Sequence, residues 1–264
     1  MDTRPIGIFD SGIGGLTVAS AIAGRMPAER LIYFGDTAHL PYGDKSPETI
    51  REYSFRIVEF LIQQDCKLIV IACNSASAAA SAALNERFAA QIPLVNVIDP
   101  LVHFVERQRV RRVGIIATKA TINSGVYERK LQSLIPNIRL FSMATPLLVP
   151  MIEEGFVHNR VSQAILSEYL SHPGFDDIEA LLLACTHYPL IRPHIEAFFQ
   201  NRVSVWDSTE ATATAVFDEL TLRGILSPDR GGPHLFCVSD YTTAFEQAAR
   251  MFYPEDIQLK HVGV

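Results

Sequence analysis

Short apolar runs that end in small or polar residues constrain this chain most strongly. The run LIVIAC (68–73) ends on Cys73, and the run ALLLAC (180–185) ends on Cys185. Nearly continuous apolar runs of this length are typical of parallel strands buried on both faces, and the amphipathic segments between them suit crossover helices. The sequence therefore predicts an α/β fold in which each cysteine lies at the end of a strand.

The same pattern recurs along the whole chain. Its 264 residues are 48% hydrophobic, enough to bury one large core or two smaller ones. One helix is expected over residues 46–64, because Ser46 can cap it and Pro47 suits its first turn. An apolar stripe on that helix comprises Ile50, Phe55, Ile57, Val58 and Leu61. Strands are expected at residues 6–10, 30–36, 68–73, 94–98, 113–118, 138–143, 180–185, 203–208 and 234–239.

An internal similarity indicates that the chain contains two related halves. The segments IGIFDSG and VGIIATK begin 107 residues apart, and Cys73 and Cys185 are 112 residues apart. In open parallel sheets, ligands bind outside the carboxyl ends of the strands. Two such halves packed face to face would therefore place the two cysteines on opposite sides of one cleft.

Composition excludes several classes of function. The net charge of −6 gives no basic excess, so we expect no nucleic-acid partner. No apolar run is long enough to cross a bilayer, and the N-terminus does not resemble a secretion signal, so we expect a cytoplasmic protein without a membrane partner. The four cysteines, Cys66, Cys73, Cys185 and Cys237, are then expected to be thiols. Cys66 and Cys237 are interpreted as core residues. Motifs such as CxxC and HExxH do not occur, and we expect no metal.

Two opposed thiols can invert a stereocentre. An unperturbed thiol has a pKa of about 8.5, so it can act as a base when ionised and as an acid when protonated. A proton alpha to a carboxylate is weakly acidic, so the site would have to assist its removal. It could do so by excluding water and by directing hydrogen-bond donors at the developing negative charge. The segment GIGG (12–15) leads into an expected helix whose backbone N–H groups could hold a carboxylate. Its alternative role is a tight turn without a ligand.

Six motifs carry a resemblance to a known family. In this order, the chain resembles the glutamate racemases of the aspartate/glutamate racemase family at FDSGIGGLTV (9–18), GDTAHLPYGDKS (35–46), ACNSASA (72–78), GIIATKATINSGVY (114–127), VPMIEEG (149–155) and LACTHYPL (183–190). The resemblance implies an α/β fold of two pseudo-symmetric, doubly wound parallel-sheet domains with the active site in the cleft between them. It implies one domain from residues 1–95 plus 208–264 and a second from residues 96–207.

The resemblance also implies an activity. It is the cofactor-independent racemisation of L-glutamate to D-glutamate by a two-cysteine, two-base mechanism, which supplies D-glutamate for peptidoglycan synthesis. The expected partners are the substrate glutamate and a second copy of the chain in a homodimer.

The family's functional residues can be carried over where the motifs match. Cys73 and Cys185 correspond to the catalytic thiols, Asp10 and His187 to the groups beside them, and Glu153 to the acidic partner of His187. Glu154 is adjacent, and the sequence alone leaves the choice between the two open. The substrate-binding set implied by the resemblance is Asp10, Ser11, Tyr42, Gly43, Asn74, Ser75, Thr118, Thr121, Thr186 and His187.

The chain departs from the family pattern at three positions. Ser75 stands where the family usually has threonine, and His39 and Leu40 replace the small and basic residues expected before PYG. Three other functions remain open. An aspartate racemase would share the fold, a nucleophilic hydrolase could use Cys185 activated by His187, and a noncatalytic bilobed amino-acid-binding protein would need neither thiol.

Overall fold

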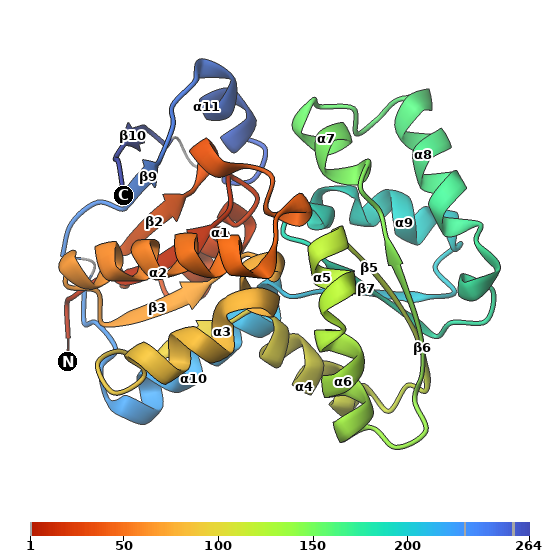
Figure 1. The fold of residues 1–264 in the computed structure, drawn as a ribbon, viewed down its shortest axis with the longest axis horizontal. Helices are drawn as coiled ribbons and strands as arrows, with labels where there is room; N and C mark the ends of the chain where they lie inside the picture. The colour runs from red at the N-terminus through yellow and green to blue at the C-terminus, as the bar shows by residue number, and fades with distance from the viewer. Residues whose placement is uncertain (1, 230, 255–256) are drawn as a thin grey trace.

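Two parallel sheets form the framework of the molecule (Figure 1). The computed structural model describes residues 2–229, 231–254 and 257–264. Sheet A has the order β10-β9-β2-β1-β3-β4, and sheet B has the order β6-β5-β7-β8. The strands of sheet A are β1 (Ile6–Asp10), β2 (Leu31–Gly35), β3 (Leu68–Ile71), β4 (Leu94–Asn96), β9 (Leu235–Val238) and β10 (Leu259–His261). Those of sheet B are β5 (Arg112–Ala117), β6 (Arg139–Ala144), β7 (Ala180–Ala184) and β8 (Ser204–Asp207). The predicted α/β fold with two parallel-sheet domains is confirmed.

The two sheets repeat one arrangement of strands. The order β2-β1-β3-β4 in sheet A corresponds to β6-β5-β7-β8 in sheet B, and every pairing within both sheets is parallel. β3 and β7 are therefore equivalent strands, and Cys73 and Cys185 follow their equivalent ends. This repeated strand order is the structural basis of the internal similarity predicted from the sequence.

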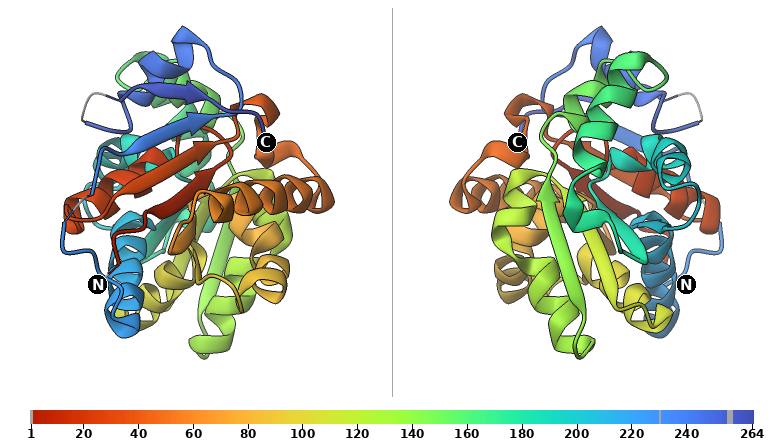
Figure 2. Two further views of the ribbon diagram at one scale, coloured as in Figure 1. Left: turned by 90° about the vertical axis from the view of Figure 1, so that its left-hand side faces the viewer. Right: turned by 90° about the vertical axis from the view of Figure 1, so that its right-hand side faces the viewer.

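The C-terminal part of the chain returns to sheet A. β9 pairs with β2, and β10 pairs with β9, so that β9 and β10 extend the edge of sheet A beyond the repeated unit. Figure 2 shows this blue segment beside the red N-terminal strands. The domain boundaries at residues 95/96 and 207/208 stay a prediction.

Helices cover both faces of each sheet. In and around sheet A, α1 (Leu16–Arg25) and α10 (Thr209–Arg223) pack on one face, and α2 (Pro47–Gln63) and α3 (Asn74–Phe88) pack on the other. Sheet B lies between α7 (Leu148–Glu153), α8 (Arg160–Leu170) and α9 (Arg192–Phe198) on one face and α4 (Ile98–Gln108) and α6 (Val126–Leu134) on the other. The remaining helices are α5 (Lys119–Ser124) and α11 (Thr243–Ala249), with 3₁₀ turns η1 (Thr37–His39), η2 (Tyr42–Asp44), η3 (Pro173–Phe175) and η4 (Tyr188–Ile191).

The predicted helix over residues 46–64 forms as α2. Ser46 is its N-cap and accepts a hydrogen bond from the backbone N–H of Thr49, and Pro47 occupies the first position. The stripe is buried at Ile50, Ile57, Val58 and Leu61, whereas Phe55 is half-buried. Within the described ranges, no helix combines the length and apolar character that a membrane crossing requires.

Candidate active site

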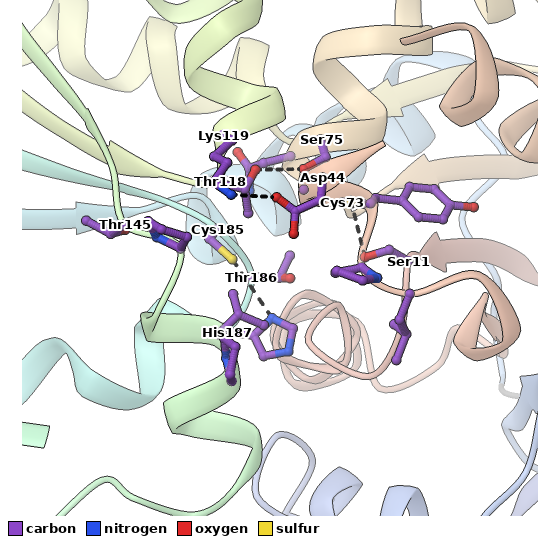
Figure 3. Close-up of a pocket in the computed structure, with 18 of the residues that line it drawn as sticks. Ser11, Asp44, Cys73, Ser75, Thr118, Lys119, Thr145, Cys185, Thr186 and His187 are labelled. Atoms are coloured by element: carbon purple, nitrogen blue, oxygen red, sulfur yellow. Dashed lines mark hydrogen bonds and ion pairs between the residues drawn. The ribbon is translucent and has the colours of Figure 1, made fainter. Parts of the chain in front are cut away.

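A cavity of about 340 Å³ lies between the two domains (Figure 3). Its walls come from segments that follow the carboxyl ends of strands in both sheets, as expected for parallel α/β domains. Both cysteines at the equivalent strand ends line it, Cys73 from the sheet A side and Cys185 from the sheet B side. Nine more of the predicted site residues also line it: Ser11, Tyr42, Gly43, Asn74, Ser75, Thr118, Glu153, Thr186 and His187.

Cys73 lies at the start of a helix. It is the N-cap of α3, and its Sγ accepts a hydrogen bond from the backbone N–H of Ala76 at 3.4 Å. The thiol lies 3.6 Å from the Oγ of Ser11, and the residue is only 5% exposed. Burial and the nearby Asp10 carboxyl raise the pKa of Cys73 to about 12, although the contacts with Ala76 and Ser11 lower it. The helix N-terminus favours the thiolate, and the burial disfavours it.

Cys185 lies beside an imidazole that is itself paired with a carboxylate. His187 Nδ1 is 3.9 Å from Cys185 Sγ, and His187 Nε2 is 2.8 Å from Glu153 Oε1. Burial alone would lower the pKa of His187, but the contacts with Cys185 and Glu153 raise it to about 10. The ring is therefore an imidazolium at neutral pH, with one N–H directed at each partner. The structure pairs His187 with Glu153, and Glu154 is exposed.

Asp10 lies behind the cavity wall. Its carboxyl is fully buried, accepts a hydrogen bond from the N–H of Gly12 at 2.9 Å, and lies 3.4 Å from the hydroxyl of Thr186. Burial raises the pKa of Asp10, whereas the charge of His187 and the backbone N–H groups of Gly12 and Gly15 lower it. Asp10 does not line the cavity, and its contact with the Thr186 hydroxyl connects it to a residue that does.

Hydroxyl and amide groups cover the opposite side of the cavity. Ser75 Oγ is 2.9 Å from Thr118 Oγ1, and Thr121 completes a cluster of three hydroxyls without lining the cavity itself. The amide of Asn74 is oriented by Tyr127, whose hydroxyl donates to Asn74 Oδ1 at 2.7 Å. The Nδ2 group of Asn74 is buried without a protein partner. A buried donor of this kind is complementary to an anionic ligand group.

Sequence reasoning missed eight residues that line the cavity: Leu40, Pro41, Asp44, Lys119, Thr145, Pro146, Val149 and Pro150. Thr145 follows β6, so the strand-end pattern that singled out Thr118 could have found it. The prolines and Val149 carry no chemical signal. Lys119 and Asp44 form an ion pair at 3.1 Å between α5 and η2, which joins the two domains at the cavity.

The other cysteines are separate from the site. Cys66 and Cys237 are free, buried thiols within the apolar cluster that contains α2 and α3, which confirms their interpretation as core residues. In the part of the chain that the structure describes, no group of three or more His, Cys, Asp or Glu side chains could hold a metal ion.

Fold and site together define a two-domain α/β protein with a thiol from each domain in one shared cavity. A family model described as Asp/Glu/Hydantoin racemase matches residues 16–216. A glutamate racemase from Chlorobaculum tepidum is 41% identical over 251 residues, which are 94% of this chain and 92% of the relative. The chain belongs to the Asp/Glu/hydantoin racemase family.

Solved structures agree with this assignment. The crystal structure of glutamate racemase from Francisella tularensis in complex with D-glutamate has a TM-score of 0.93 and 39% identity, and the match covers 100% of this chain and 98% of that chain. The glutamate racemase from Thermus thermophilus in complex with beta-chloro-D-alanine has a TM-score of 0.89 and 37% identity, covering 100% and 99%.

Proposed function

We propose that this protein interconverts L-glutamate and D-glutamate without a cofactor, with Cys73 and Cys185 as the two acid–base groups. One observation carries the proposal: two buried cysteines at equivalent strand ends of the two domains line the same cavity. Relatives named glutamate racemase are about 40% identical over nearly the whole chain, and this supports glutamate as the substrate.

The reaction needs one thiolate and one thiol. The thiolate of one cysteine takes the proton from Cα, so that an S–H bond forms and the Cα–H bond breaks. The electron pair is delocalised into the α-carboxylate, and the other cysteine's thiol gives its proton to the opposite face of Cα. The product is the other enantiomer, and the two cysteines have exchanged protonation states. Each cysteine therefore acts as the base for one enantiomer.

The surroundings of the thiols support this chemistry. Both are almost completely buried, with exposures of 5% for Cys73 and 7% for Cys185, so water competes little for the proton. The imidazolium of His187 stabilises negative charge on the Cys185 side, and Glu153 holds its ring in place. We assign Asp10 to the equivalent position beside Cys73, where the Thr186 hydroxyl lies between its carboxyl and the cavity.

Neutral donors are proposed to hold the two carboxylates of the substrate. They comprise the predicted set of Ser11, Tyr42, Gly43, Asn74, Ser75, Thr118 and Thr186, with Thr121 supporting the hydroxyl cluster. Tyr42 and Gly43 contribute backbone N–H groups, since the Tyr42 hydroxyl donates to Asp36. Hydroxyls and amides can bind a carboxylate without the fixed fork of an arginine, which suits a site that must accept both enantiomers. The free Nδ2 of Asn74 is the donor that most needs such a partner.

In the cell, we propose that the product D-glutamate serves peptidoglycan synthesis in the cytoplasm and that the enzyme is a homodimer. The alternatives explain less of the site. A hydrolase accounts for Cys185 and His187 and leaves Cys73 without a role, and a noncatalytic binding protein needs neither thiol. An aspartate racemase would use the same chemistry, so the substrate must be measured.

Proton NMR in deuterated water tests the proposal directly. The purified protein is incubated without cofactor with L-glutamate, D-glutamate or either enantiomer of aspartate, and the products are separated by chiral chromatography. We expect the α-proton signals of both glutamate enantiomers to disappear and the mixture to become racemic. If only aspartate exchanges its α-proton, the assignment of glutamate as the substrate is wrong. If neither glutamate nor aspartate exchanges, the proposed racemase activity is wrong.

Separate Cys73→Ser and Cys185→Ser variants test the two-base mechanism. Each should lose racemisation by at least about a hundredfold, because removing either group removes general acid or base catalysis. Residual α-proton exchange should differ between the L- and D-enantiomers in opposite senses for the two variants. Cys66→Ser is the matched control and should racemise like the unchanged protein. Dependence on one cysteine only would exclude two opposed bases.

A further inference from the structure

Asp36 lies at the centre of a hydrogen-bonded network behind the cavity wall. It follows β2, and its side chain is only 4% exposed. Its Oδ1 accepts a hydrogen bond from the hydroxyl of Ser239 at 2.7 Å and lies 2.8 Å from His39 Nδ1. Its Oδ2 accepts a hydrogen bond from the hydroxyl of Tyr42 at 2.5 Å. A buried carboxylate with three donors has a fixed orientation, because rotation would break several charge-assisted hydrogen bonds at once.

The network determines the position of a wall that has little regular structure. Residues 36–45 form two 3₁₀ turns, η1 and η2, and such short turns supply few backbone hydrogen bonds. Pro41, Tyr42 and Gly43 of this segment line the cavity. Burial raises the pKa of Tyr42 far above its usual range, so its hydroxyl stays protonated and donates to Asp36.

Gly43 shows how closely this wall meets the other domain. A Cβ placed on Gly43 would lie 2.9 Å from the Cβ of Thr118. A displacement of the segment by a few tenths of an ångström would therefore change the cavity. Asp36, His39 and Ser239 do not line the cavity, so they act on the substrate site through this segment.

His39 is the surface-accessible end of the network. Its side chain is 37% exposed, stacks on Tyr53 with ring centroids 4.1 Å apart, and directs Nδ1 at Asp36. This is one of the positions at which the chain departs from the family pattern. The Tyr53 ring also lies 5.8 Å from that of Tyr42, so the aromatic contacts join the same residues as the hydrogen bonds.

We propose that His39 is a positioning residue for the substrate cavity, acting through Asp36 on the wall formed by Pro41, Tyr42 and Gly43. The inference rests on the proposed function for its kinetic consequence. A wall that contacts the substrate in the ground state and the transition state alike affects KM more than kcat. Loss of the His39 contact should therefore weaken substrate binding and leave the chemical step largely intact.

Three variants at position 39 separate positioning from packing. His39→Leu removes the donor, His39→Asn keeps an N–H close to the position of Nδ1, and His39→Gln places its N–H farther out. His103→Leu is the matched control, since His103 forms a similar i,i+3 pair with Glu106 on the surface of α4. We expect KM for glutamate to rise roughly tenfold in His39→Leu with kcat within about twofold, and His39→Asn to recover most of the loss. His39→Gln should have the same raised KM as His39→Leu. His103→Leu should have the KM and kcat of the unchanged protein.

Hydrogen exchange measured by mass spectrometry supplies a second readout that does not need activity. The peptide spanning residues 36–46 contains the amides of His39 and Lys45, which donate within the two turns. It should exchange faster in His39→Leu and at the original rate in His39→Asn. Unchanged exchange in His39→Leu would overturn the inference, as would faster exchange with unchanged KM. If the unchanged protein does not racemise glutamate, the proposed function fails, and the exchange of this peptide alone decides whether His39 positions the wall.

Discussion

The two thiols lie in opposite electrostatic surroundings. The carboxyl of Asp10 helps to raise the pKa of Cys73, whereas Cys185 faces the imidazolium of His187. The two cysteines therefore differ in the ionisable group beside them, a carboxyl for Cys73 and an imidazole for Cys185. Although the reaction is symmetric, the two groups that catalyse it are not. The values of kcat and KM should therefore differ between L- and D-glutamate, since the reaction of each enantiomer begins with a different base.

Glu153→Gln should narrow the pH range of activity. Glu153 and Cys185 raise the pKa of His187 to about 10 from 6.5, so the imidazolium persists well above neutral pH. With the Glu153 charge removed, the pKa of His187 falls, and the positive charge beside Cys185 is lost at lower pH. We expect the high-pH limb of kcat/KM to move to lower pH, measured as racemisation rates between about pH 6 and 11.

Glu154→Gln is the control for this variant. Glu154 is adjacent and exposed, so it should leave the high-pH limb in place. Equal shifts in both variants would mean that the limb responds to the net charge of the protein, and the assignment of Glu153 as the partner of His187 would lose its support.

At the scale of elements, the apolar pattern predicted most of the framework. The strand expected at residues 6–10 is β1, and the strand expected at residues 180–185 is β7, which ends one residue earlier. Buried parallel strands are easy to recognise because both faces must be apolar. β10 was missed because it is three residues long and carries the exposed Lys260 and His261.

The same contrast applies to the site. Residues that follow strands could be predicted, because the carboxyl ends of parallel strands meet at one edge. Val149 and Pro150 reach the cavity from α7, and their place depends on how that helix packs against sheet B. Asp36 lies beside Ser239 only after β9 has joined β2, a long-range pairing that no local pattern encodes.

Gly14 is required where the turn before α1 meets the segment after β7. A Cβ on Gly14 would lie 2.3 Å from His187 Nδ1 and 2.6 Å from the hydroxyl of Thr186. Gly14→Ala should therefore displace the ring of His187, and we expect kcat to fall roughly ten- to hundredfold, because small misplacements of catalytic groups have effects of this order. Steady-state racemisation rates check this expectation.

Gly24→Ala is the matched control within the same region of the chain. Gly24 lies inside α1, and a Cβ there meets nothing within 4 Å. It should leave kcat unchanged and raise the free energy of unfolding by about 0.5–1 kcal/mol, since alanine is the better helix former. Full activity of Gly14→Ala would show that the contact with His187 can relax without affecting the reaction.

At the scale of the whole molecule, the two domains share a continuous apolar core. One cluster of buried side chains extends from Ile6 and Ile8 of β1 to Leu181 and Leu183 of β7. Polar contacts cross the same boundary, since Thr17 of α1 donates to the carbonyl of Thr186 at 3.1 Å. The two domains are therefore joined by apolar packing and by polar contacts.

A buried ion pair holds the segment that returns from α10 to sheet A. Lys67 Nζ lies 2.7 Å from Glu29 Oε2, and the two side chains are 0% and 1% exposed. Lys67 also donates to the carbonyl of Ile225, and Glu29 accepts from the N–H of Ser227. These three interactions join the starts of β2 and β3 to each other and to the chain that leads to β9.

Lys67→Met should destabilise the whole protein by about 3–5 kcal/mol, because it leaves the Glu29 carboxylate buried without its partner. The double variant Lys67→Met/Glu29→Gln should be less destabilised than the sum of the two single variants, since it removes both charges together. Urea unfolding followed by circular dichroism measures these differences.

Arg56→Met is the control for this prediction. Arg56 pairs with Glu52 on the surface of α2 with side-chain exposures of 51% and 61%, and such surface pairs contribute little to stability. Additive losses in the double variant would mean that the two charges act independently, and the stability of the C-terminal return would then depend on its backbone contacts with β2.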